Sequence, residues 1–504
     1  MQTLSASDLH NKARPPVGRL LSLRSTSFYF ALLAAVCLLL ADIEIISPNP
    51  WFELQAMGRG LLNPRIVSYS ELFTGLASTL SFALQGMAVA VVAGFGLSLV
   101  YRHWWVRTCC AFIRAIHELF WALIFIQCFG LSPLTGLLAI ALPYAATLAK
   151  VYGEIFEEGS QQARGNLHQR QSLSAFLYTS LPLAWPSLTH YSRYRFECAL
   201  RSTVVLGFVG LPTLGFYLET SLSEGLYSEA AGLIYVLLLL IASQRWWLQK
   251  RLLPVYLLVA VVCLPPSANF SWQTLTQFFT EDIVPQPLRT AGANSLGPWL
   301  ILLWQQQLWP GLLNTLVLSQ IALFFTALLA LLSFPFNANL FVGPLTRRGC
   351  TGLLLIARTL PEYLLAFVGL LLWGPSMLPA IVALVLHNGA IIAHLLAGFS
   401  ENIALRSDAS RGLNRYVYEV LPRIYRQFLA LLFYRWEVIL RESAILGILG
   451  IATLGFYIDS AFEEFRFDRA ALLILASALL NMAVDTVART LRRRLHLVTT
   501  ADIR

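Results

Sequence analysis

The stretch YRWEVILRESAILGILGIATLGFY, residues 434–457, decides how the rest of the chain is understood. A second version, YRFECALRSTVVLGFVGLPTLGFY, occupies residues 194–217, and the two share 13 of 24 positions without a gap. Three pairs of charged residues and three pairs of glycines are among them: Arg195/Arg435, Glu197/Glu437, Arg201/Arg441, Gly207/Gly447, Gly210/Gly450 and Gly215/Gly455. A spacing of 240 residues is far longer than the unit of a solenoid. The repeat therefore predicts two related domains fused in one chain.

The composition indicates that both domains lie in a membrane. Of the 504 residues, 57% are hydrophobic and 12% are charged, whereas soluble domains carry about 25% charged residues. The net charge of +9 is better explained by basic cytoplasmic loops than by nucleic-acid binding, so we expect no nucleic-acid partner. The seven cysteines show no spacing typical of a metal site or of a disulfide framework. We expect no metal and no cofactor.

The apolar segments predict an all-α polytopic membrane protein with twelve transmembrane helices, six in each domain. Each segment is near the ~20 residues that a bilayer requires. Outside the two repeated stretches, they cover residues 27–41, 73–101, 111–129, 134–151, 230–243, 252–264, 309–334, 352–373, 377–397 and 470–487. No small-residue cleavage site follows the first segment, so we interpret it as an uncleaved span. The predicted units are a tail (1–26), two domains (27–250 and 251–495) and a second tail (496–504).

The distribution of Lys and Arg predicts the topology. Basic residues cluster after the even-numbered spans, on the side of the N-terminal tail, while the opposite side is mainly acidic. By the positive-inside rule, both termini are cytoplasmic. The two domains then lie parallel, which is an established plan for transporters.

A polar stretch precedes each repeated segment, at about residues 152–182 and 398–422, and each ends in Leu-Pro. These stretches resemble the coupling loop of binding-protein-dependent ABC importer permeases, which docks on a separate ATPase. The resemblance places eight residues in such loops: Ala163, Arg164, Gly165, Pro182, Ala404, Leu405, Ala409 and Pro422. It is incomplete, because Ile403 stands in place of the motif Glu and Ala409 in place of the motif Gly. No Walker A pattern occurs, so the ATPase must be another polypeptide.

The repeated segment itself is similar to permeases of phosphonate, phosphite and phosphate-ester ABC importers. A second motif, Arg114 to Glu118 and Arg358 to Glu362, matches the mid-membrane motif of the same family. The resemblance implies a bacterial inner-membrane permease that is not itself an enzyme. It also implies two copies of an ABC ATPase and a periplasmic or lipid-anchored substrate-binding protein as partners, besides the lipid bilayer. The cargo it implies is a phosphonate-, phosphite- or phosphate-like oxyanion.

Charges inside predicted spans are costly and mark functional candidates. Arg201 and Arg441 could supply positive potential to an anion pathway, because the planar guanidinium meets two oxygens at once. Each Arg follows a Glu by four residues, the favourable order for an intrahelical pair. The alternative is that these charges only hold helices together. The pathway candidates are Arg201, Arg441, Glu197, Glu437, Arg114, Arg358, Glu118, Glu362 and His387.

The repeated glycines are expected where each repeated helix leaves the membrane on the external side. They could form a gate or could serve helix packing alone. Of the histidines on apolar segments, we interpret His117 and His394 as core residues and keep His387 as a candidate for substrate contact.

Two rival functions stay open at this point. One is a permease of the same fold for another solute, such as an amino acid or a metal chelate. The other is a secondary carrier, or a membrane-embedded enzyme, that uses Glu118, Glu197, Glu362 and Glu437 as a proton relay without an ATPase.

Overall fold

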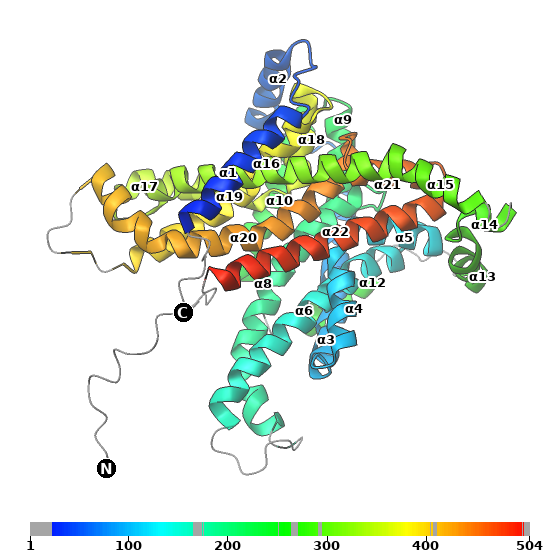
Figure 1. The fold of residues 1–504 in the computed structure, drawn as a ribbon, viewed down its shortest axis with the longest axis horizontal. Coiled ribbons are helices and arrows are strands. Elements are labelled where there is room, and N and C mark those ends of the chain that lie inside the picture. The colour runs from blue at the N-terminus through cyan, green and yellow to red at the C-terminus, as the bar shows by residue number, and fades with distance from the viewer. Residues whose placement is uncertain are drawn as a thin grey trace.

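The computed structural model describes residues 23–164, 174, 176–249, 251–263, 271–290, 295–403, 405–406, 411–495 and 497. Within these ranges the chain is built from helices and contains no strand (Figure 1). Five helical segments are long and apolar enough to cross a membrane: 69–99, 133–157, 296–337, 377–401 and 467–494. The prediction of an all-α polytopic membrane protein is therefore confirmed.

The helices occur in the same order in both halves of the chain. In the first half they are α3 (Tyr69–Leu99), α4 (Trp104–Ala115), α5 (Glu118–Phe129), α6 (Pro133–Arg164), α8 (Leu181–Gly207), α9 (Leu214–Ser223) and α10 (Tyr227–Ala242). In the second half they are α16 (Trp309–Ser333), α17 (Pro344–Thr359), α18 (Glu362–Trp373), α19 (Met377–Glu401), α20 (Leu421–Ile445), α21 (Leu454–Glu463) and α22 (Phe467–Arg494). In Figure 1, α16, α20 and α22 run across the view, whereas α6 and α8 run steeply to them.

Shorter helices open each half and connect the two halves. They are α1 (Leu23–Leu40), α2 (Pro50–Leu62), α11 (Gln244–Trp247), α12 (Leu253–Val262), α13 (Trp272–Gln277), α14 (Gln286–Thr290) and α15 (Leu296–Leu303). Helix α15 continues into α16 through the π-helical turn η4 (Trp304–Leu308), so this helical segment begins before the apolar segment predicted at residues 309–334.

Two predicted spans are sharply broken, which corrects the sequence-based expectation of straight helices over residues 111–129 and 352–373. The axes of α4 and α5 meet at 91°, and those of α17 and α18 at 93°. Ile116 and Leu360 take extended conformations (ψ 131° and 132°) at the two breaks. For Leu360 the cause is the following Pro361, whose ring disfavours a helical conformation at the residue before it.

The repeated segments are broken as well, and their last glycines lie at the break. A Cβ on Gly215 would be 1.8 Å from the carbonyl oxygen of Val204, and one on Gly455 would be 1.6 Å from that of Ala444. Gly450 has a φ of +83°, a left-handed conformation that favours glycine. The glycines therefore fold the start of α9 and α21 back against the ends of α8 and α20.

The first glycine of each repeat lies on the other side of the same contact, but the two copies end their helices differently. Gly207 is the last residue of α8, whereas Gly447 follows α20 and lies in the 3₁₀ turn η7 (Leu446–Leu449). A Cβ on Gly207 would be 2.2 Å from the backbone nitrogen of Phe216, and one on Gly447 would be 2.1 Å from that of Phe456. The chain therefore turns back on itself at both glycines, and their role as a gate remains a prediction.

The first helix of each half packs on the other half. Helix α1 lies along α16 and α12 lies along α3. The ring of Phe30 in α1 packs at a tilt against Phe433 and edge-on against Trp436 of α20, with centroids 5.2 and 5.1 Å away. The two halves are therefore interlocked, and the domain boundaries at residues 250 and 251 remain a prediction.

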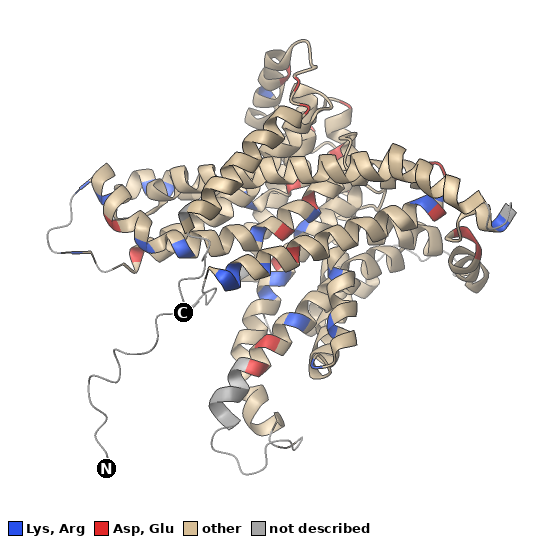
Figure 2. Ribbon diagram, viewed as in Figure 1, with Lys and Arg blue, Asp and Glu red and all other residues tan. Residues whose placement is uncertain are grey.

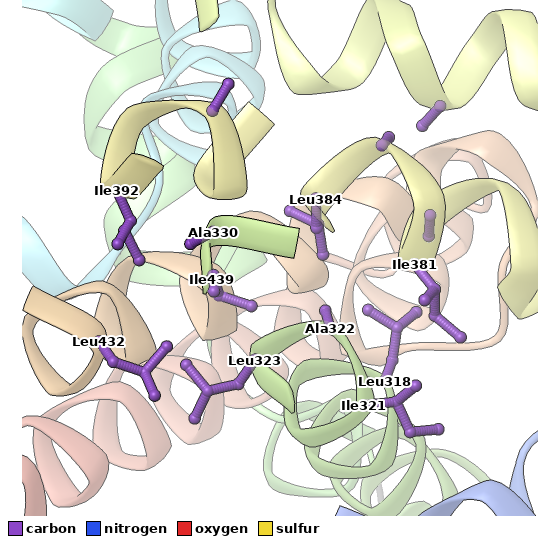
Figure 3. Close-up of a cluster of buried hydrophobic side chains, with 14 of the residues drawn as sticks. Leu318, Ile321, Ala322, Leu323, Ala330, Ile381, Leu384, Ile392, Leu432 and Ile439 are labelled. Atoms are coloured by element: carbon purple, nitrogen blue, oxygen red, sulfur yellow. The ribbon is translucent and has the colours of Figure 1, made fainter. Parts of the chain in front are cut away.

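The largest apolar cluster fills the space between α16, α19 and α20, where Leu318, Leu384 and Ile439 are fully buried (Figure 3). Between α3 and α6, glycines allow a close approach, with Gly94 facing Leu148. Such packing stabilises helix pairs where lipid is as apolar as the side chains.

Twelve spans remain a prediction. Besides the five long helices, three bent pairs and three apolar helices of 10–17 residues could cross a membrane or enter it. The cytoplasmic placement of the termini is likewise a prediction. Charged residues gather at the centre of the fold and at helix ends such as Arg492–Arg494 of α22 (Figure 2).

Candidate functional site: a charged cavity between the two halves

A cavity of about 160 Å³ lies where the broken helices meet α6, α8, α19 and α20. Six Lys or Arg and four Glu line it. The charged lining residues are Arg114, Glu118, Lys150, Arg195, Arg201, Glu362, Arg435, Glu437, Arg441 and Glu442. Of the nine pathway candidates predicted from the sequence, all but Glu197 and Arg358 line this cavity, including His387.

Two arginines hold the broken helices of the opposite half. Arg201 Nη1 of α8 donates a hydrogen bond to the carbonyl oxygen of Arg358 at 3.0 Å. Arg441 Nη1 of α20 donates the equivalent bond to the carbonyl oxygen of Arg114, also at 3.0 Å. Both acceptors lie in the last turn of a helix, where carbonyl oxygens lack intrahelical partners and a cation is favoured. The two bonds therefore form a reciprocal pair across the halves.

Glu118 at the first break is held by groups of its own half. Ser202 Oγ donates to Glu118 Oε1 at 2.6 Å and lies 3.0 Å from the hydroxyl of Tyr144. His117 Nε2 is 3.6 Å from Glu118 Oε2. His117 therefore lines the cavity, which the sequence-based interpretation as a core histidine did not anticipate.

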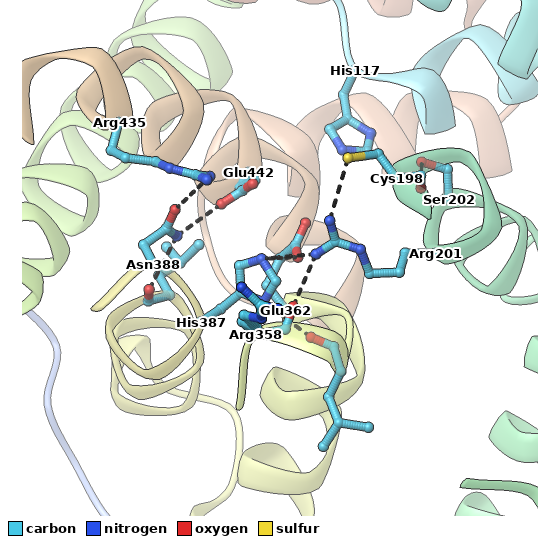
Figure 4. A network of polar contacts seen from close by, with 12 residues as sticks. His117, Cys198, Arg201, Ser202, Arg358, Glu362, His387, Asn388, Arg435 and Glu442 are labelled. Carbon is cyan, nitrogen blue, oxygen red and sulfur yellow. Dashed lines mark hydrogen bonds and ion pairs between the residues drawn. The ribbon is translucent and has the colours of Figure 1, made fainter. Parts of the chain in front are cut away.

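Glu362 at the second break has a different neighbour. His387 Nε2 lies 3.7 Å from Glu362 Oε2 and 3.3 Å from Arg201 Nη1 (Figure 4). His387 Nδ1 lies 3.0 Å from the carbonyl oxygen of Leu360. Because arginine can only donate and a carbonyl can only accept, both contacts are satisfied by neutral histidine with its proton on Nδ1. In that form His387 accepts a hydrogen bond from Arg201 and carries no positive charge that could pair with Glu362.

A buried chain of polar contacts in the second half was missed by the sequence analysis. Asn388 Nδ2 donates to Glu442 Oε2 at 3.1 Å, and Arg435 Nη1 donates to Asn388 Oδ1 at 3.3 Å (Figure 4). Glu442 is only 7% exposed. The search for repeated charges overlooked Glu442, since its counterpart in the first half is Ser202. A carboxyl group inside an apolar segment was the signal that could have found it.

The expected intrahelical pairs do not form. Glu437 Oε1 lies 3.6 Å from Arg114 Nη2 of the other half, and Arg114 Nη2 is also 3.4 Å from Asp485 of α22. Glu197 and Arg201, both within the described ranges, make no ion pair with each other. The two glutamates of the repeat therefore have different surroundings.

Three of the guanidinium groups that line the cavity keep a buried donor without an acceptor. Nε of Arg114, Arg201 and Arg441 is buried and has no hydrogen-bond partner in the described part of the chain. A buried donor without a partner costs about 1–3 kcal/mol, and more when it belongs to a charged group. All three residues line the cavity, so a bound oxyanion could supply the missing acceptors.

The resemblance to a coupling loop rests on residues that the structure describes only in part. Pro182 and Pro422 lie in the first turn of α8 and α20, each after a π-helical turn (η1, Phe176–Ser180; η6, Arg415–Val420). Ala163 and Arg164 end α6, and Leu405 lies between α19 and η6. Gly165, Ala404 and Ala409 lie outside the described residues.

A multi-pass helical protein with two equivalent sets of helices around a charged intramembrane cavity has the plan of a transport permease. The family model described as "Binding-protein-dependent transport system inner membrane component" matches residues 331–497. The chain is 24% identical to the phosphate-import permease protein PhnE of Mycolicibacterium smegmatis, over 88% of this chain and 89% of that protein. It is 26% identical to the phosphite transport system permease protein PtxC of Stutzerimonas stutzeri, over 35% of this chain and 69% of that protein.

A putative cryptic phosphonate transport system permease protein, PhnE2 of Escherichia coli, is 30% identical over 23% of this chain and 96% of its own length. No solved structure gives a significant match. The chain belongs to the family of binding-protein-dependent transport system inner membrane components. It is a multi-pass inner-membrane permease.

Proposed function

We propose that this chain is the complete membrane permease of an ABC importer for a phosphate-, phosphonate- or phosphite-type oxyanion. The observation that carries the proposal is the cavity, whose six Lys or Arg outnumber its four Glu by two. That excess matches a dianion, and guanidinium groups suit tetrahedral oxyanions because of their bidentate geometry. The printed names of three relatives, for phosphate, phosphite and phosphonate transport, support the same class of cargo.

In this proposal one chain supplies both halves of the pathway, as domains 27–250 and 251–495. The relatives support a duplication, because PtxC is covered over 69% of its length by an alignment spanning only 35% of this chain. Two ATPase subunits would dock on the cytoplasmic stretches at about 152–182 and 398–422, and a loaded binding protein would dock on the opposite face. Both termini would be cytoplasmic.

The crossed arginine bonds suggest how closure by the ATPase subunits could reach the cavity. Each polar stretch leads directly into α8 or α20, and those helices carry Arg201 and Arg441. A shift of either helix moves an arginine that is bonded to the broken helix of the other half. The two halves would therefore change access together.

The test is uptake by proteoliposomes that hold the chain with its ATPase and loaded binding protein. We expect ATP-dependent accumulation of labelled phosphate, phosphite or methylphosphonate. Uptake of an unrelated solute, with no oxyanion accumulation, would contradict the cargo. A variant ATPase that binds but does not hydrolyse ATP is the control.

Buried Glu442 and the Glu118–His117 contact favour one rival, a proton-coupled carrier. Uptake that needs no ATPase and stops when a protonophore removes the proton gradient would support this rival. Uptake that needs ATP and survives the protonophore would exclude it.

A further inference from the structure

The two halves differ at the positions that surround the cavity. A spacing of 244 residues relates α6 to α19, since these helices begin at Pro133 and Met377. With this spacing, and 240 for α8 and α20, five related pairs carry different side chains: His117/Pro361, Pro143/His387, Tyr144/Asn388, Lys150/His394 and Ser202/Glu442. All but His394 and Asn388 line the cavity. The repeat thus keeps its arginines but changes the groups beside them.

This divergence gives the two walls of the cavity different net charges. The first half contributes four cations (Arg114, Lys150, Arg195, Arg201) and one carboxylate, Glu118. The second half contributes two cations (Arg435, Arg441) and three carboxylates (Glu362, Glu437, Glu442). With neutral histidines, the wall from the first half carries +3 and the wall from the second half carries −1.

Hydroxyl groups are divided in the same way. Tyr144, Thr147, Tyr191, Tyr194 and Ser202 line the cavity from the first half, and Tyr434 is the hydroxyl from the second. Helix α6 supplies five lining residues, whereas α19 supplies His387. Helices α8 and α20 supply seven and six lining residues, so the difference between the halves lies at α6 and α19.

Two cations of the first wall are available to a ligand, whereas Arg114 is paired with Glu437 and Asp485. In the described chain, Arg195 and Arg201 have no carboxylate within 4.0 Å. Arg195 Nε donates to the Tyr191 hydroxyl at 2.7 Å, and its guanidinium lies over the Tyr191 ring, which orients the group without neutralising it. In the second half, Arg435 and Arg441 also have no carboxylate within 4.0 Å in the described chain. The difference is that Asn388 links Arg435 to Glu442.

We infer that the cavity is a single, one-sided oxyanion-binding site, in which one tetrahedral anion rests against Lys150, Arg195 and Arg201 of the first half. The carboxylate-rich wall of the second half keeps the anion from binding there. A volume of about 160 Å³ admits such an anion with water, since one water needs only about 10–15 Å³. Only the identity of the anion rests on the proposed function.

The test measures binding to the intact chain alone, in lipid nanodiscs, without ATPase or binding protein. Equilibrium dialysis with radiolabelled phosphate, and separately with methylphosphonate, is expected to show saturable binding of one anion per chain. Lys150→Met should weaken binding by about tenfold or more, the effect of losing about 1.4 kcal/mol. His394→Met, at the related position of the second half, is the matched control and should leave affinity unchanged.

A reciprocal exchange tests the one-sidedness. Ser202→Glu gives the first wall the carboxylate of the second and should abolish binding. Glu442→Ser gives the second wall the hydroxyl of the first and should retain binding at full affinity or better. Each variant must first show the thermal unfolding midpoint of the wild type; where Ser202→Glu does not, the Lys150 and His394 variants decide.

Equal losses in both halves would overturn the one-sided site, and so would two anions per wild-type chain. Absence of saturable binding, in a preparation that still imports an oxyanion once the ATPase and binding protein are added, would overturn the site and leave the proposed function standing. Saturable binding without any oxyanion uptake would support the site and contradict the proposed function.

Discussion

The guanidinium group of Arg441 donates a hydrogen bond to the main-chain carbonyl of Arg114, 327 residues away in the sequence, at 3.0 Å. Arg201 makes the same bond to Arg358 in the opposite direction. In each case an arginine of one half completes the last turn of a broken helix in the other. The repeated arginines therefore form equivalent contacts between the two halves.

Arg201→Lys should lower uptake by about tenfold or more. Lysine keeps the positive charge but lacks the planar guanidinium group, whose Nη1 contacts the carbonyl oxygen of Arg358 and His387 while Nη2 donates to Cys198. Initial uptake rates in proteoliposomes measure the effect. Arg348→Lys, an exposed position at the start of α17, is the control and should transport normally. Normal uptake by Arg201→Lys would show that charge alone suffices.

Gly215→Ala and Gly455→Ala should each prevent normal folding. The added methyl group would lie 1.8 or 1.6 Å from a backbone carbonyl oxygen, so the backbone itself must move. Overpacking of this kind costs typically 1–3 kcal/mol, and more where backbone is the obstacle. Yield of monodisperse protein and the thermal midpoint report the loss. Gly398→Ala meets no atom within 4 Å and should behave as wild type.

Ser202→Ala should destabilise the chain by about 1–3 kcal/mol, because it removes the hydroxyl that donates to Glu118 inside the membrane. Denaturant titration in detergent measures the change. Thr220→Ala removes an exposed hydroxyl that bonds only within its own helix and should cost far less. Equal free energies of unfolding for the two variants would show that the Ser202–Glu118 hydrogen bond does not contribute to stability.

Two separately expressed pieces, 1–250 and 251–504, should co-purify as a stable pair. The reason is the packing of α1 on α16 and of α12 on α3, which joins each piece to the other. Affinity purification through a tag on one piece measures recovery of its partner. Removing α1 should lower that recovery sharply, because Phe30 no longer packs between Phe433 and Trp436. Unchanged recovery would show that the contacts of α1 are dispensable.

Comparison of the two halves predicted six charged residues of the cavity, since a charge retained in both copies of an apolar segment is costly and marks a functional position. The same comparison could not find Glu442, because the repeat has lost it in the first half, where Ser202 takes its place. Nor could it show that Glu437 would contact Arg114, because spacing along one helix gives no information on helices from the other half.

The helix breaks were only partly predictable. Pro361 could have indicated the bend before Glu362, because the residue before a proline avoids helical geometry. His117 at the related position carries no such restriction, yet its bend is nearly the same, 91° against 93°. At each bend, an arginine of the other half donates a hydrogen bond to a carbonyl oxygen in the last helical turn before the bend. Tertiary contact, in addition to local preference, therefore accompanies the bend in the first half.

The exchange of first helices has a consequence for the order in which the protein is made. Helix α1 is translated first, but its partner α16 begins only at Trp309. At roughly 5–20 residues per second, α1 waits on the order of tens of seconds before its packing surface exists. During that interval the side chains of α1 that are buried in the complete fold, among them Ala34 and Cys37, lack these partners. Fusing the halves in one polypeptide guarantees that the late partner arrives beside the helix that needs it, in equal number and in the same patch of membrane.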